Sequence, residues 1–316
     1  MLNKFELSEG KIVPSGQERP PIWVFSAPDE NEKKILETEF RIDAHTLASA
    51  LDPDEPSRLE SQDGRSVLIL KTPKNFMGKG QLLFKVASVG LFLFPERLAV
   101  VTSEDVPLLS GKDFQSIQSL PGLHLRIIAR SIHHFLEHLR IINMLTDEIE
   151  AKISVSMENK YLLNLFSLEK SLVYYLNAIN SNGFVFEKLK NNGAKLGFSA
   201  PQLEFLDDII IENSQCYRQA EIYSNILASL MDARVSIVSN NLNILMKTLN
   251  LVTIGIMVPT LVVSIFSMNV SIPLEKHPMA FWIIMSLAVV SVAGVTLWWR
   301  RIAAMLERGD RGGSRN

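Results

Sequence analysis

Two long uncharged runs near the C-terminus dominate the pattern of hydrophobic and polar positions. No Asp, Glu, Lys or Arg lies between Lys247 and Glu275, and none lies between His277 and Arg300. Each run is longer than the roughly 20 residues that a membrane-spanning helix needs. Two such runs in tandem argue against a pair of buried core helices. We predict a first transmembrane helix at 248–270, an external loop at 271–278 and a second transmembrane helix at 279–299.

Aromatic and basic residues at the ends of the runs predict the orientation. Trp282, Trp298 and Trp299 lie near the ends of the second run, where interfacial aromatic residues are common. The tail at 300–316 contains Arg300, Arg301, Arg308, Arg311 and Arg315, whereas the external loop has only Glu275, Lys276 and His277. Because positive residues favour the cytoplasmic side, we expect a multi-pass protein of the inner or plasma membrane with both termini in the cytoplasm.

Residues 1–120 are predicted to form a cytoplasmic α/β domain. Short apolar runs of strand type lie at 66–71, 82–88, 91–94 and 98–103. Pro95, Glu96 and Arg97 separate the last two runs and suit a hairpin turn. The segments 23–43 and 46–60 are helix-like, with Asp and Pro punctuation.

From Gly122 onward the apolar positions take the spacing of long helices, which we predict over 121–247. The residues that recur at three- and four-residue steps are Ile128, Ile132, Phe135, Leu139, Ile142, Leu145 and Ile149. We expect breaks at 181–183 and around 191–193. A new helix then opens after Ser199, which forms a capping-box pattern with Gln202. A continuous helix from Gln202 to Phe266 would be roughly 95 Å long and would run from the cytosol into the bilayer.

Polar residues of the first membrane segment fall on one side of this helix. The stripe, called the polar seam below, advances in alternating steps of three and four and consists of Asn243, Met246, Asn250, Thr253, Met257, Thr260, Ser264 and Ser267. Polar groups in a bilayer face a bundle interior or a water-filled path. One helix cannot enclose a pore, but a ring of copies could.

A ring of such helices would present uncharged oxygens to its axis, with Met246 and Met257 as apolar constrictions. This lining suits a hydrated cation such as Mg²⁺, which dehydrates reluctantly. An inside-negative potential of 100 mV would supply about 4.6 kcal/mol for two charges, and the sequence has no phosphate-binding P-loop motif. The alternative is that the Ser and Thr hydroxyls bond to their own helix or join neighbouring helices.

Composition narrows the functional classes. The net charge of −2 argues against a nucleic-acid partner, and the single cysteine, Cys216, is expected to be a buried apolar residue. His134 and His138 have metal-ligand spacing but no third ligand, so we expect a solvated helix face there. No catalytic constellation stands out, so we do not expect an enzyme.

The sequence resembles the CorA family of divalent-cation transporters. The pieces that match are "SNNLNILMKTLNLVTI", "PTLVVSIFSMNVSIP", the second membrane helix, the basic tail and, further upstream, "TLASALDPDEPSRLE". The resemblance implies a funnel-shaped homopentameric Mg²⁺ channel whose pore follows the first membrane helix. It implies that Asn269 of the Ser267-Met268-Asn269 triplet rings the external mouth, that Met246 and Met257 form a hydrophobic gate, and that Asn243 forms a polar ring on the cytoplasmic side.

The chain departs from the family pattern at two places. Ser267 stands where the family triplet Gly-Met-Asn has glycine. The family also closes its pore by binding Mg²⁺ between subunits through paired carboxylates. Asp208 matches one partner of that regulatory metal site, but the other aligns with Ala48 and Ser49, which carry no carboxylate. Asp52, Asp54 and Glu55 lie nearby and are possible replacements.

Together these patterns predict an α+β membrane protein with an N-terminal α/β cytoplasmic domain, long cytoplasmic helices that continue into two C-terminal transmembrane helices, and a funnel-shaped homo-oligomer. The function we expect is potential-driven Mg²⁺ uptake. One alternative is transport of Zn²⁺ or another divalent cation, coupled to protons. The other is a non-conducting, membrane-anchored sensor or scaffold.

Overall fold

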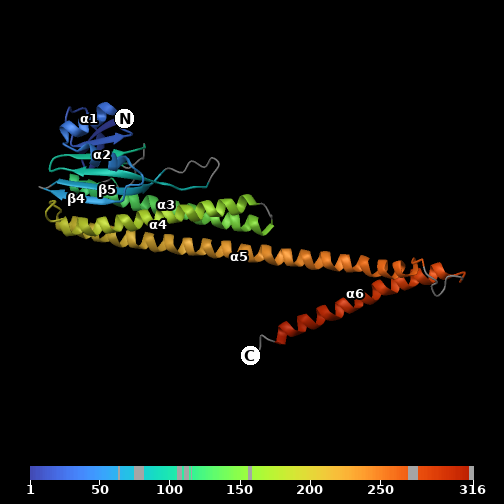
Figure 1. Ribbon diagram of the computed structural model, residues 1–316. Helices are drawn as coiled ribbons and strands as arrows, with labels where there is room; N and C mark the ends of the chain where they lie inside the picture. The colour runs from blue at the N-terminus through green and yellow to red at the C-terminus, as the bar shows by residue number, and fades with distance from the viewer. Residues whose placement is uncertain are drawn as a thin grey trace. The chain divides into compact units, whose positions relative to one another are not determined.

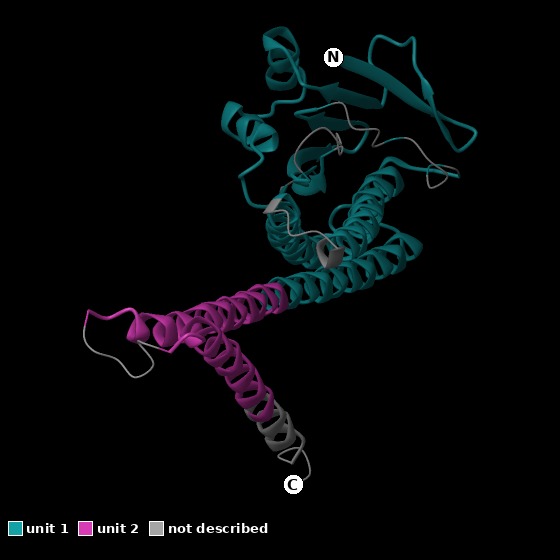
Figure 2. Ribbon diagram, turned by 90° about the vertical axis from the view of Figure 1, so that its right-hand side faces the viewer, with its two compact units in different colours: residues 1–232 teal, residues 233–316 magenta. Residues whose placement is uncertain are grey.

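The computed structural model describes residues 1–62, 65–74, 82–104, 109, 114, 116–155, 159–269 and 277–312. It contains two compact units, residues Met1–Asp232 and residues Ala233–Asn316 (Figure 2).

The first unit contains a seven-stranded sheet. Its strands are β1 (Leu2–Ser8), β2 (Lys11–Pro14), β3 (Ile22–Ser26), β4 (Arg58–Gln62), β5 (Arg65–Pro73), β6 (Val86–Leu93) and β7 (Leu98–Thr102). Their spatial order is β2-β1-β3-β7-β6-β5-β4. Neighbouring strands are antiparallel except β3 and β7, which are parallel.

Helices cover both faces of this sheet. On one side lie α1 (Glu30–Glu39) and α2 (Ala44–Leu51), and on the other lie α3 (Leu120–Val155) and α4 (Asn159–Asn192) (Figure 1). Successive strand residues therefore enter different cores: Ile69 packs with the α1–α2 side, whereas Leu68 and Leu70 pack with the α3–α4 side. Burial on both faces explains why β5, β6 and β7 read as continuous apolar runs rather than as alternating ones.

The strand predictions are confirmed for β5 and β7, and the hairpin turn is confirmed by the Phe94 N–H bond to the Arg97 carbonyl at 2.8 Å. The runs 82–88 and 91–94 are not two strands, because β6 continues through Gly90. A Cβ at Gly90 would lie 2.8 Å from the Cβ of Ala50, so glycine here allows α2 to approach the sheet. Trp23–Ser26, predicted as helix-like, is strand β3.

The apolar seam predicted for the first long helix is confirmed, because its residues lie in the core or pack against it. The predicted break at 181–183 is wrong, since α4 continues through these residues. Their polar character serves tertiary contacts instead. Ser181 Oγ accepts from the Ser57 N–H, and Asn182 bonds to β5. A Cβ at Gly183 would lie 3.0 Å from Asn213 Nδ2, so glycine leaves room for this amide. The second predicted break is confirmed by the end of α4 at Asn192.

Helix α5 (Ala200–Phe266) is continuous for 67 residues, as predicted. At its start the Ser199 N–H donates to Gln202 Oε1 at 2.9 Å, which is the side-chain half of a capping box. Helix α6 (Ala280–Gly312) follows in the second unit. Both α5 and the Ala280–Arg301 part of α6 are long and apolar enough to cross a membrane, each with a window of mean hydropathy 2.2.

Candidate ion-conduction site

The C-terminal half of α5 carries the polar seam on one side. Every member from Asn243 to Ser267 is exposed in the single chain. The less exposed positions of the same segment are on the opposite side of the helix: Leu251, Gly255, Val258, Pro259, Val262 and Phe266. Within the described part of the chain no residue of the seam is covered, which leaves the seam open to lipid, water or another chain.

The seam hydroxyls bond to their own helix. Thr253 Oγ1 donates to the Leu249 carbonyl at 2.9 Å, and Thr260 Oγ1 donates to the Ile256 carbonyl at 2.7 Å. The alternative stated from the sequence, in which hydroxyls bond to their own helix, is thus observed for Thr253 and Thr260. It does not remove the oxygens from the outer surface, because a hydroxyl that donates inward keeps its lone pairs for an outside donor.

The triplet Ser267-Met268-Asn269 follows the last residue of α5 directly. Ser267 donates to the Ser264 carbonyl twice, from its backbone N–H at 3.2 Å and from its Oγ at 3.0 Å. Its φ is not positive, so serine replaces glycine without left-handed backbone strain. Met268 and Asn269 are exposed just beyond the helix end.

Asp208, the predicted regulatory ligand, is exposed on α5. Its neighbour Asp207 forms an ion pair with Lys190 at 2.6 Å. Ala48 is exposed on α2 and Ser49 is buried. In the described part of the chain there is no group of three or more His, Cys, Asp or Glu side chains placed to hold one metal ion.

The possible replacement carboxylates already face a buried cation, which sequence reasoning missed. Lys71 as a residue is 5% exposed, and its ammonium donates to the Pro53 carbonyl at 2.6 Å and to Ser88 Oγ at 2.8 Å. Burial lowers the pKa of Lys71, and the nearby carboxylates of Asp52, Asp54 and Glu55 oppose that shift. The charge of these acids is therefore partly balanced within their own domain. A lysine in an apolar strand, preceded along the chain by an Asp/Glu-rich turn, was the available signal.

The expected solvated face at His134 and His138 is wrong for His138. This side chain is 5% exposed, and its Nδ1 lies 2.6 Å from the Tyr175 hydroxyl oxygen. Burial lowers the pKa of His138 to about 4, so the ring is neutral in the core. Cys216 is buried, as expected.

Comparison with known proteins places this geometry in a family. Residues 21–301 match the family model described as CorA-like Mg2+ transporter protein. The curated "Cobalt/magnesium transport protein CorA" of Methanocaldococcus jannaschii is 25% identical over 295 residues, which cover 89% of this chain and 90% of the relative.

Solved structures show the same fold. The complete CorA magnesium transporter from Methanocaldococcus jannaschii has a TM-score of 0.80 at 22% identity and matches 95% of this chain and 96% of its own. The full-length CmaX protein has a TM-score of 0.69 at 13% identity, with 93% and 94% covered. The ZntB cytoplasmic domain from Vibrio parahaemolyticus has a TM-score of 0.60 at 14% identity, with 75% of this chain and 97% of that domain covered. The chain therefore belongs to the CorA-like Mg²⁺ transporter family, whose members are channel-like divalent-cation transporters and not enzymes.

Proposed function

We propose that the protein transports hydrated divalent cations, Mg²⁺ above all, through a homopentameric pore lined by the polar seam of α5. The observation that carries this proposal is the seam itself: seven of its residues lie on one side of the continuous helix α5, Ser267 follows the helix directly, and all eight are exposed in the single chain. Copies of the helix arranged around an axis would shield the seam from lipid and turn it toward a shared water-filled path. A protein that only needed an anchor would gain nothing from this pattern.

The seam chemistry suits a cation that keeps its water. The water molecules around Mg²⁺ point their hydrogens outward, so the surrounding wall must accept hydrogen bonds. Thr253 and Thr260 direct their own protons to helix carbonyls and thus offer acceptors to the outside. Asn243 and Asn250 add amide oxygens, while Met246 and Met257 supply apolar rings that would gate the pore by dewetting. Membrane potential would drive entry.

The proposed topology has a cytoplasmic α/β domain at 1–120 and long cytoplasmic helices at 121–247. The membrane helices at 248–270 and 279–299 flank an external loop at 271–278, and the tail at 300–316 returns to the cytoplasm. This places Ser267, Met268 and Asn269 at the external mouth, where the Asn269 amides would hold an incoming hydrated ion. Parts of this loop and tail lie outside the described residues.

Liposome flux tests the entry role. The Asn269→Ala variant should lose Mg²⁺ uptake, because the mouth would no longer offer an amide oxygen to the hydrated ion. Asn241→Ala is the matched control, since Asn241 lies on the side of α5 opposite the seam residue Asn243 and should tolerate the change. Unchanged flux in Asn269→Ala would refute the assignment. Absence of flux in the wild type with every metal tried would favour a sensor or scaffold.

Zn²⁺ transport coupled to a proton gradient is the second candidate, favoured by the serine of the triplet. The Ser267 oxygen adds one polar group at the proposed mouth that glycine would lack. Competition among Mg²⁺, Zn²⁺, Co²⁺ and Ni²⁺ should be compared between wild type and Ser267→Gly. A changed order of preference would assign a selectivity role to the serine, and an unchanged order with faster flux would make it only a restriction.

Regulation by Mg²⁺ at Asp208 is proposed as an intersubunit event. Asp208→Asn should raise flux at high internal Mg²⁺ if this carboxylate helps to close the pore. The same change at Asp207 serves as the control, because Asp207 is already paired with Lys190. Equal effects of the two substitutions would argue against a specific metal site.

A further inference from the structure

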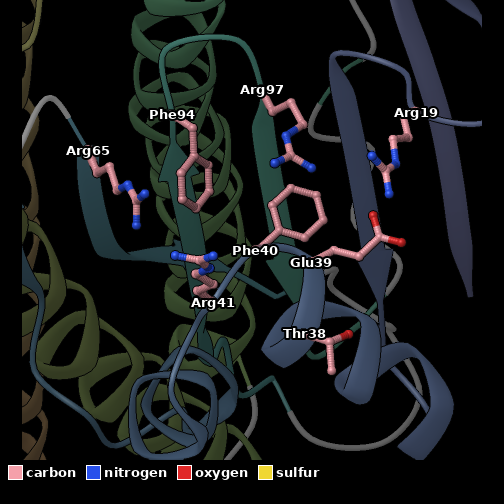
Figure 3. Close-up of a pocket in the computed structure, with 8 residues that line it drawn as sticks. All are labelled: Arg19, Thr38, Glu39, Phe40, Arg41, Arg65, Phe94 and Arg97. Carbon is pink, nitrogen blue, oxygen red and sulfur yellow. The ribbon is translucent and has the colours of Figure 1, made fainter.

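A cavity of about 460 Å³ lies in the first unit, away from every residue assigned so far (Figure 3). Its walls come from the loop before β3, the end of α1, the start of β5 and the β6–β7 hairpin. The volume falls within the range of about 300–1,000 Å³ that is typical of small-molecule sites. Four arginines line it: Arg19, Arg41, Arg65 and Arg97.

The charges of these arginines are not balanced within the cavity. In the described part of the chain, none of the four guanidinium groups forms an ion pair. The one acidic side chain in the wall is Glu39, and its Oε2 is buried without a hydrogen-bond partner in that part. Four cations held around one cavity repel each other. A multiply charged anion would remove this repulsion.

Two phenylalanine rings hold part of the cluster in place. The Arg97 guanidinium lies 5.1 Å from the centre of the Phe40 ring, and that of Arg65 lies 5.8 Å from the centre of the Phe94 ring. The two rings are 5.7 Å apart and belong to one packed aromatic group. Cation–π contact on one face of a guanidinium leaves its N–H edges free to donate, and this fork geometry matches phosphate oxygens.

The backbone at Arg41 is strained in favour of this arrangement. Arg41 has a φ of 53°, in the left-handed region, directly after Phe40, the C-cap of α1. Glycine is the usual residue at such a position because it adopts this conformation without steric conflict. An arginine that keeps an unfavourable conformation at the cavity wall indicates a use for its side chain.

We propose that this cavity binds the polyphosphate group of a nucleoside polyphosphate. The four guanidinium groups would bind the phosphate oxygens, and the unpartnered Glu39 carboxylate oxygen would accept a hydrogen bond from a hydroxyl or amino group of the nucleoside. A simple phosphate chain could not use Glu39 in this way, since it offers no such donor. The proposed site can be tested independently of the proposed transport function, because the experiment measures ligand binding and not ion flux.

Calorimetric titration of the full-length protein in detergent, at low salt, tests the proposal with ATP and with inorganic triphosphate. Arg41→Gly is the sharpest variant, because it removes the guanidinium and relieves the backbone. It should weaken ATP binding at least about tenfold while the thermal midpoint stays unchanged or rises. Arg97→Gln should weaken binding similarly. Arg140→Gln is the control of equal charge change, since Arg140 is exposed on α3 outside the cavity, and it should bind as the wild type does.

Glu39→Gln distinguishes the two sources of phosphate. Loss of the negative charge should tighten triphosphate binding, whereas ATP binding should gain less or weaken because a charged acceptor is lost. Equal tightening of both would overturn the nucleoside assignment. Absence of binding by either compound, or equal effects of Arg41→Gly and Arg140→Gln, would overturn the site. A change in the oligomeric state of the cavity variants would assign the arginines to a subunit interface and would also overturn it.

Discussion

The Asn182 side chain takes the place of the strand partner that β5 lacks beyond Ile69. Strand β4 pairs with β5 only as far as Ile69, so the next backbone groups on that edge have no strand to bond. Asn182 Oδ1 accepts from the Lys71 N–H, and its Nδ2 donates to the Lys71 carbonyl, both at 2.8 Å. The amide is completely buried. This one residue thus ties α4 to the sheet.

Replacement of Asn182 with leucine should therefore lower the free energy of unfolding by about 3 kcal/mol, because the Lys71 N–H loses its partner in the core and the Lys71 carbonyl keeps only the Ser131 hydroxyl. Chemical denaturation followed by circular dichroism measures the change. Asn177→Leu, at an exposed position of α4, should shift stability by no more than about 0.5 kcal/mol. Equal effects of the two substitutions would contradict the assigned role.

Two buried histidines should make the protein sensitive to acid. Burial lowers the pKa of His124 and of His138 to about 4, whereas both would titrate near 6.5 in the unfolded chain. The unfolded state therefore binds more protons between these values, and the free energy of unfolding should fall as pH drops from about 6.5 to 4, by roughly 3 kcal/mol for the fully buried His124 and by less for His138.

The pH dependence of unfolding in His124→Leu isolates one of these contributions. Neither ring nitrogen of His124 has a hydrogen-bond partner in the described part of the chain, so leucine leaves no polar group unpaired. The variant should lose less stability between pH 6.5 and 4 than the wild type does. A parallel profile would show that His124 titrates normally.

At the scale of elements, the seam side of the membrane part of α5 and its other exposed sides are alike in the single chain. Val252 and Ile265 are as open to the surroundings as the seam residues Thr253 and Ser264. Only the surroundings of the assembled protein separate them: the seam should meet water, and the other sides should meet lipid or protein.

Cysteine labelling tests this difference in the membrane. Thr253→Cys and Ser264→Cys should react with a membrane-impermeant maleimide, while Val252→Cys and Ile265→Cys should not. The native background is low, because burial raises the pKa of Cys216 to about 12 and only the thiolate reacts. Equal labelling at all four positions would remove the water-filled axis from the proposal.

The long helices were predictable from sequence because their apolar seams repeat over many turns, as from Ile128 to Ile149. The segment 181–183 was misread because Ser, Asn and Gly favour turns locally, and here distant partners such as Ser57 and Lys71 use them. Strand β6 was split because its glycine serves a helix contact. Local composition cannot register such long-range uses.

The difference between local and long-range patterns also explains why the sequence predicts the polar seam but not the arginine cavity. The polar seam lies on one element, so its spacing appears directly in the sequence. The arginine cavity draws Arg19, Arg41, Arg65 and Arg97 from four segments that only the sheet topology brings together. Each arginine alone reads as ordinary surface charge.

At the scale of the whole molecule, the second unit leaves its apolar surface to its surroundings. Large apolar side chains such as Leu261, Phe281 and Trp282 are more than 60% exposed in the single chain. Lipid suits these groups but not the polar seam, so a symmetric assembly that turns the seam inward is the arrangement we expect.

For the proposed homopentamer, whose subunit number comes from the family resemblance, native mass measurement in detergent should give five copies of the 35.5 kDa chain. Cross-linking through Thr253→Cys, close to the predicted axis, should produce covalent dimers, whereas Val252→Cys serves as the control and should give fewer. A monomer at all protein concentrations would leave the proposed pore without walls.

Within this unit, Pro259 determines where helix α5 can bend most easily. Pro259 has no N–H, so the Gly255 carbonyl one turn earlier lacks its usual helical donor, and glycine there adds backbone freedom. Both residues lie between Thr253 and Thr260. Any flexing of the helix should therefore concentrate at the middle of the proposed conduction path, where a small bend would widen or narrow the proposed ring of Met257 side chains.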